Sequence, residues 1–130
     1  MEWNELRSAI DERIKKEFIP LLRQRRFKGS YPHFRRKRND HLDILGFQFS
    51  LYGPQFWIEI SSAPYKEVLL SNGKVVPPEK LKYYHCMVLL RKRIGDNPFD
   101  MEKETPQLII NKVISCMEDA EQWWREKHEG

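Results

Sequence analysis

The chain has 130 residues, of which 40% are hydrophobic and 32% charged, and its 23 Lys and Arg against 19 Asp and Glu give a net charge of +4. This length favours one domain that buries about two-thirds of its unfolded surface, so we expect a single domain over residues 1–130. No apolar run approaches the roughly 18 to 20 residues of a membrane span, and the charged amphipathic N-terminus is unlike a secretory signal, so we expect a cytoplasmic protein without membrane contact.

The placement of the positive charge is more informative than its sum. It is concentrated in three short runs, which are Arg23, Arg25, Arg26 and Lys28; Arg35, Arg36, Lys37 and Arg38; and Arg91, Lys92 and Arg93. The two cysteines, Cys86 and Cys116, have no second pair to frame a disulfide scaffold. We expect both to be reduced and at least partly buried.

The N-terminal segment has the periodicity of an amphipathic helix. Apolar residues recur at three- and four-residue steps from Trp3 onward, which predicts a helix over about residues 3–25. Pro20 removes an interior hydrogen bond, so the helix should kink there or restart with Pro20 in its first turn. Gly29 suits the exit from the helix, where a positive φ is wanted, and residues 30–38 are expected to form the first strand.

Residues 43–62 carry the most regular pattern of the chain, a β-hairpin with one apolar and one polar face. Apolar and polar side chains alternate on both sides of a turn at residues 52–55, as expected of half-buried antiparallel strands. The apolar face is expected to hold Leu45, Phe47, Phe49, Leu51, Phe56, Ile58 and Ile60. Trp57 falls on the polar face.

A tight turn at residues 39–40 should join the first strand to this hairpin, because Asn and Asp both tolerate a left-handed backbone. With these two as the loop residues, the register pairs Phe34 with Leu45 and Arg36 with Asp43. Phe34 is therefore expected to join the apolar face.

The second half of the chain is predicted to contain one more strand and one more helix. Residues 63–79 hold two prolines and a turn signal at residues 71–74, which indicate a loop with a short ribbon. The nearly continuous apolar run in residues 83–91 predicts a fourth strand covered on both faces. After a loop at residues 95–104, a Thr-Pro pair opens a helix that ends near residue 127.

The element order is thus helix, antiparallel meander of three to four strands, helix. Amphipathic helices and a sheet with one apolar face bury their apolar sides against each other. We therefore expect a two-layer α+β fold, with the sheet packed on the N- and C-terminal helices.

Several short segments resemble a known family. They are Phe27-Lys28-Gly29, Phe34-Arg35-Arg36, Gly46-Phe47-Gln48-Phe49-Ser50 with Gly53, and Phe56-Trp57-Ile58-Glu59-Ile60. Over about residues 9–62 the chain resembles a widespread bacterial family named domain of unknown function 4304. The resemblance implies a small two-layer domain and transfers no activity. The chain departs from the family pattern at Glu59, where Asn is common, and at Trp57, where a smaller β-branched residue is common.

We expect a non-catalytic ligand- or protein-binding module that uses the polar sheet face. Trp57 motivates this hypothesis, because an indole directed to water is costly unless it anchors a partner. The candidate binding residues are Arg35, Gln48, Ser50, Trp57 and Glu59. The other interpretation is that the loop at residues 63–79 covers Trp57 and makes it part of the core.

Nucleic acid is the alternative partner, because a strand with aromatic residues beside cations can stack bases and hold phosphates. The candidate contacts are Tyr31, His33, Arg35, Arg36, Lys37 and Arg38. Successive cations on a strand point alternately to both faces, however, and basic residues on an edge strand also deter aggregation.

Catalysis is less favoured, because the register leaves His33 about two strand positions from Ser50, and no catalytic residue is assigned. The histidines lack short ligand spacings and no glycine-rich phosphate loop occurs, so we expect neither a metal nor a cofactor. A toxin-neutralising, immunity-type protein is a further alternative, although a net charge of +4 argues against mimicry of nucleic acid. The sequence indicates no oligomeric state.

Overall fold

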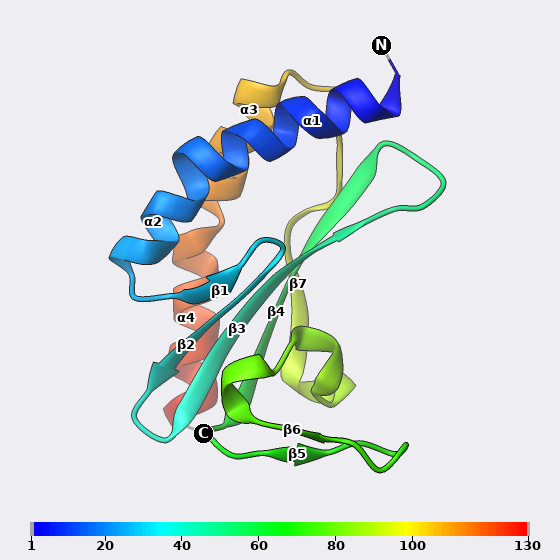
Figure 1. Cartoon of the computed structure of the whole chain (residues 1–130). Helices are drawn as coiled ribbons and strands as arrows, with labels where there is room; N and C mark the ends of the chain where they lie inside the picture. Colours follow the sequence, from blue (N-terminus) through cyan, green and yellow to red (C-terminus); the bar gives the residue numbers. More distant parts are fainter. Residues whose placement is uncertain (1, 130) are drawn as a thin grey trace.

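The computed structural model describes residues 2–129 and confirms the predicted α+β class (Figure 1). A five-stranded antiparallel sheet in the order β1-β2-β3-β4-β7 has one strand more than the upper expected number. Its strands are β1 Lys28–Ser30, β2 His33–Arg38, β3 His41–Phe49, β4 Gln55–Pro64 and β7 Arg91–Asp100. A separate two-stranded ribbon pairs β5 Val68–Leu69 with β6 Val75–Val76.

The N-terminal helical segment restarts near Pro20, as predicted. It consists of α1 Trp3–Arg13, a π-helical turn η1 Ile14–Phe18 and α2 Ile19–Gln24. Pro20 lies in the first turn of α2, where a missing N–H costs no interior hydrogen bond. The apolar stripe is buried along the whole segment, at Leu6, Ile10, Ile14, Phe18 and Leu22.

The C-terminal helix begins where the Thr-Pro pair predicts, but it is interrupted. The Thr105 Oγ1 accepts a hydrogen bond from the Leu108 backbone N–H at 3.2 Å, which caps α3 Pro106–Ser115. A break at Cys116 separates this helix from α4 Met117–Glu129. The predicted face is buried in both helices, at Ile109, Val113, Met117, Ala120 and Trp124.

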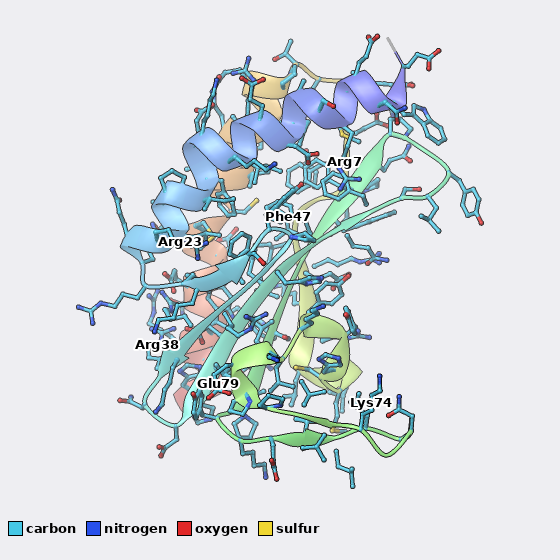
Figure 2. The ribbon with its side chains drawn as sticks, in the orientation of Figure 1. Arg7, Arg23, Arg38, Phe47, Lys74 and Glu79 are labelled. Atoms are coloured by element: carbon cyan, nitrogen blue, oxygen red, sulfur yellow. The ribbon has the colours of Figure 1, made fainter. Side chains whose placement is uncertain are left out.

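The register of the first hairpin is as predicted, whereas the loop of the second is longer than predicted: β3 ends at Phe49, and Leu51 is exposed in that loop instead of lying on the apolar face. In β2 and β3, Phe34 pairs with Leu45 and Arg36 pairs with Asp43. The alternation therefore sorts apolar side chains toward the helices, and Phe47 lies between sheet and helices in Figure 2. Its ring meets Phe18 edge-on, with 5.7 Å between the ring centroids. Burial of each such aromatic side chain contributes about 1.5 to 3 kcal/mol, so this layer dominates stability.

The first predicted strand is in fact two strands. β1 ends at Ser30, and β2 begins at His33 after a turn that contains Tyr31. The Tyr31 hydroxyl donates a hydrogen bond to Asp11 Oδ1 on α1 at 2.6 Å, which draws this turn to the helical layer. The prediction for Gly29 is wrong in place: the left-handed residue after the end of α2 is Arg26, with a φ of 72°, whereas Gly29, with a φ of +111°, lies within β1.

The predicted strand over residues 83–91 is wrong, and the loop predicted at 95–104 is partly strand. Residues in this region form two 3-10 turns, η3 Tyr83–His85 and η4 Val88–Leu90, and β7 runs from Arg91 to Asp100. Met87 and Leu89 are 69% and 82% exposed, so the apolar run is not covered on both faces. The edge strand beside β4 is instead the basic segment that begins at Arg91. In this strand Arg93 pairs with Glu59.

The chain between β4 and β7 covers part of the second sheet face (Figure 1). After the ribbon and a short 3-10 turn, η2 Pro78–Lys80, Leu81 and Tyr83 pack on Leu42, Ile44 and Ala63. This second, smaller apolar cluster makes that face only partly polar.

Candidate binding site

The segment from Leu81 to Tyr83 crosses the sheet face away from the helices and leaves a groove on each side. The crossing is close, because a Cβ added to Gly46 on β3 would lie 2.5 Å from Tyr83 Cδ1. The absence of a side chain at Gly46 therefore allows the Tyr83 ring to lie directly on the sheet.

One groove lies over β3, β4 and β7 and has a volume of about 580 Å³. We call it the aromatic groove, and it is lined by Gln48, Glu59, Tyr83, Tyr84, Arg91, Lys92 and Arg93. The sheet supplies its floor, and η3 supplies two tyrosine rings that meet edge-on at 5.4 Å. Its lining thus combines aromatic rings with three cations.

Arg93 of this groove contacts three other side chains. Its Nε donates a hydrogen bond to Glu59 Oε1 at 2.6 Å, and its Nη2 donates to Gln48 Oε1 at 3.4 Å. The guanidinium also lies 4.7 Å from the centroid of the Trp57 ring. Arg93 therefore joins three of the five residues predicted from the sequence.

Trp57 lies on the face predicted for it. Its side chain is half-buried, it is directed away from the helices, and it pairs across the strands with Gln48. It is absent from both apolar clusters, including the one that contains Tyr65 and Val68 of the loop at residues 63–79. The ring is therefore not one of the buried core residues, and its role as an anchor stays a prediction.

Arg35 and Ser50 lie apart from the aromatic groove. The Arg35 Nε donates a hydrogen bond to the Leu81 carbonyl oxygen at 2.9 Å, on the far side of the crossing segment. Ser50 follows the end of β3, where its Oγ accepts a hydrogen bond from the Tyr52 backbone N–H at 3.2 Å. The structure therefore brings together Gln48, Trp57 and Glu59 but neither of these two.

Sequence reasoning missed Arg93 and the two tyrosines. Arg93 belongs to the basic run Arg91-Lys92-Arg93, which is visible in the sequence. The predicted strand ends at Arg91, whereas the observed strand β7 begins there. The alternation of Arg93 with Arg91 is the signal that could have placed both on one strand face. Tyr83 and Tyr84 lie in a 3-10 turn, for which the apolar pattern gives no signal.

The residues of the predicted nucleic-acid surface are divided between the two faces of the sheet. Tyr31, Arg36 and Arg38 lie toward the helices, where the two arginines contact the buried Asp43. Arg35 and Lys37 lie on the opposite face, as alternation along β2 requires. The six residues therefore form no common surface.

The arginines on the helix side belong to a buried ion cluster. Arg36 Nη2 lies 2.7 Å from Asp43 Oδ2, and the same guanidinium donates two hydrogen bonds to Glu121, which receives a third from Arg25 at 3.1 Å. Burial alone would raise the pKa of Glu121, but the hydrogen bonds and charges of Arg36 and Arg25 outweigh it and hold that pKa below its usual value. These cations are neutralised within the fold.

His33 lies between the two grooves, beneath the crossing segment. Its ring centroid is 6.0 Å from that of Tyr83 and 5.9 Å from that of Tyr84. Burial, together with the positive charges of Lys82 and Arg35, lowers the pKa of His33 to about 4. The imidazole is therefore neutral at physiological pH.

The cysteines are free, with Cys86 half-buried and Cys116 buried. Burial raises the pKa of both thiols, to about 11 for Cys116, so neither has the character of a reactive thiolate. Within the described part of the chain, no three side chains of His, Cys, Asp or Glu converge as a set of metal ligands.

Comparison with known proteins identifies the family. Neither the curated proteins nor the solved structures gave a match to the chain. No helix among residues 2–129 is long and apolar enough to cross a membrane. The family model of the domain of unknown function DUF4304 matches residues 18–127, which extends the similarity well beyond the hairpins and through the C-terminal helices. The chain therefore belongs to the DUF4304 family.

Proposed function

We propose that this protein is a non-catalytic binding module whose aromatic groove holds an acidic ligand with a flat apolar part. The volume of about 580 Å³ lies in the range of small-molecule sites, about 300 to 1,000 Å³. The same chemistry suits a free ligand or an acidic aromatic segment of a partner protein.

The charges of the groove support an acidic ligand. Arg93 is paired with Glu59, whereas Arg91 and Lys92 have no carboxylate within 4.0 Å among the described residues. A carboxylate or phosphate on the ligand would supply this missing negative charge.

The observation that carries the proposal is the fixed position of Arg93. Contacts with Glu59, Gln48 and Trp57 hold its long side chain in one place before a ligand arrives. A preorganised guanidinium loses little conformational freedom on binding, so more of the interaction energy remains as affinity.

The arrangement of the polar side chains supports binding without catalysis. His33 is on β2 and contacts the tyrosines, whereas Ser50 is beyond the end of β3 and bonds within its own loop. A nucleophile and its base need to be within about 3 Å of each other. The free thiols fit a reducing compartment, so we propose the cytoplasm as the site of this function.

The proposal is tested with 1-naphthoate as a probe, followed by nitrogen-15 NMR of the whole chain. We expect shifts at Gln48, Tyr84 and the Trp57 indole N–H, and much weaker shifts with the uncharged 1-naphthylmethanol. Arg91→Gln should weaken naphthoate binding about fivefold or more, because a charge-assisted contact contributes about 1 kcal/mol or more.

Arg125→Gln on α4 is the matched control, since it removes the same charge from an exposed position that does not line the aromatic groove. It should leave naphthoate binding within about twofold of the unmodified protein. The proposal is wrong if naphthoate shifts no signal in the groove at millimolar concentration, or if the two arginine variants weaken binding equally.

A further inference from the structure

A second groove lies on the other side of the crossing segment, over β1 and β2. Its volume is about 570 Å³, and its lining includes Arg23, Arg26, Lys28, Arg35, Lys37 and Glu79. We call this second groove the basic groove. In the view of Figure 2, Arg23 from α2 lies toward its upper side and Glu79 toward its lower side.

The cations of the basic groove differ from the other basic residues nearby because carboxylates do not neutralise them. Among the described residues, no salt bridge joins any of the five to an acidic side chain. Arg25, Arg36 and Arg38, from the same two basic runs, all pair with Asp43 or Glu121 on the helix side. The fold thus sorts the basic runs into a neutralised set and an unneutralised set.

Three hydrogen bonds to backbone carbonyl oxygens position two arginines of the basic groove. Arg23 donates hydrogen bonds to the carbonyl oxygens of Phe27 and Gly29, at 3.1 and 2.6 Å. Arg35 donates to the Leu81 carbonyl oxygen at 2.9 Å. Backbone acceptors orient these guanidinium groups without cancelling their charge, so their remaining N–H groups are available to an anion.

The one carboxylate in the lining is engaged with a tyrosine. The Tyr65 hydroxyl donates a hydrogen bond to Glu79 Oε1 at 2.7 Å, and Lys37 Nζ lies 4.3 Å from the centroid of the same ring. The hydrogen bond to Tyr65, with the charge of Lys37, lowers the pKa of Glu79. One carboxylate cannot balance five cations.

We propose that the basic groove binds the phosphate backbone of single-stranded nucleic acid. The excess of positive charge is larger than the roughly two negative charges of one phosphate monoester, which favours a ligand with several phosphates. The cations also come from three successive elements, α2, β1 and β2, so they suit an extended chain of phosphates. This site is separate from the aromatic groove and does not depend on it.

The test is fluorescence anisotropy of a labelled oligothymidylate of about twelve nucleotides, with the whole chain. If about three phosphates are neutralised, affinity should fall about 20-fold between about 50 and about 200 mM salt. The double variant Lys28→Gln/Lys37→Gln should bind at least about tenfold more weakly at the lower salt concentration. Lys28→Arg/Lys37→Arg should restore binding.

The matched control is Lys66→Gln/Lys74→Gln, which removes the same charge from exposed positions around the β5–β6 ribbon. It should leave binding within about twofold of the unmodified protein. Equal losses of affinity in the two double glutamine variants would show that binding depends only on net charge, which would overturn the proposal. The absence of binding at low salt would also overturn it. If inorganic tripolyphosphate displaces the oligonucleotide at the same molar concentration, the groove binds polyphosphate in general, and the assignment to a nucleic-acid strand is wrong.

Discussion

At the scale of single residues, Arg93 and Trp57 illustrate how a polar sheet face becomes a site. Trp57 is directed away from the helices because alternation along β4 places its neighbours Phe56 and Ile58 in the core. Arg93 reaches it from the adjacent strand and covers one face of the ring. The indole is half-buried and is absent from both apolar clusters of the core.

Trp57→Ala is therefore expected to cost little stability. The loss of partial burial and of a cation–π contact should total about 1 kcal/mol, whereas Phe56→Ala should cost about 3 to 5 kcal/mol because it leaves a cavity in the core. Urea titration of both variants measures the difference. A loss of several kcal/mol in Trp57→Ala would mean that the ring belongs to the core.

At the scale of elements, the crossing of β3 by the segment from Leu81 to Tyr83 creates the two grooves. The segment is held by Leu81 and Tyr83 in the smaller apolar cluster and by the hydrogen bond from Arg35. Its approach to the sheet is possible because Gly46 has no side chain. The separation of an aromatic site from a basic site therefore depends on the docking of one short segment.

Gly46→Ala should displace this segment. The new methyl group would lie 2.5 Å from Tyr83 Cδ1, and relief of such overpacking costs about 1 to 3 kcal/mol. We expect a lower urea midpoint together with changed NMR signals for Tyr83 and Tyr84. Gly53→Ala is the control, since its added Cβ meets only the flexible end of Gln55.

The double variant Gly46→Ala/Tyr83→Ala isolates this contact. If the clash is the cause, the two substitutions should be less damaging together than the sum of their separate effects. Additive effects, or a Gly46→Ala protein as stable as the unmodified one, would contradict the account of the crossing.

At the scale of the whole molecule, the two faces of the sheet differ in how far their cations are paired with carboxylates. Toward the helices, buried carboxylates neutralise the arginines. On the opposite face, no salt bridge among the described residues neutralises the cations of the basic groove. Neutral His33 lies on that second face, where burial and, to a lesser extent, the neighbouring cations disfavour its protonated form.

Stability is therefore expected to fall as the pH drops below 6.5. The pKa of His33 is about 4 in the folded protein and near the ordinary value of 6.5 when unfolded, so the unfolded chain binds more protons between these pH values. Burial also lowers the pKa of His85 and His128, which adds to the same trend.

His33→Gln should reduce the slope of stability against pH in this window, because Gln does not titrate. Urea titrations at about pH 7 and pH 5 provide the measurement. A variant that loses as much stability as the unmodified protein over that interval would show that His33 does not contribute. The loss from Glu121 belongs to lower pH, since its lowered pKa gives stability that disappears only on further acidification.

Local patterns in the amino-acid sequence were enough to predict several elements correctly. The hairpin turn at residues 39–40 fixed the pairing of Phe34 with Leu45, and the Thr-Pro pair fixed the start of α3. The side to which Trp57 points followed from the same period of two. These features depend on near neighbours in the chain, and side-chain alternation and capping record them directly.

Two features depend on contacts between distant parts of the chain: which segment lies beside β4, and what covers the second sheet face. The apolar run at residues 83–91 predicted a strand. The edge strand beside β4 is instead the basic segment that begins at Arg91, and Arg93 in this strand forms a salt bridge with Glu59. The grooves arise where Tyr83 meets Gly46 across a long loop. Such choices depend on competition between distant segments for one surface, and local periodicity does not record that competition.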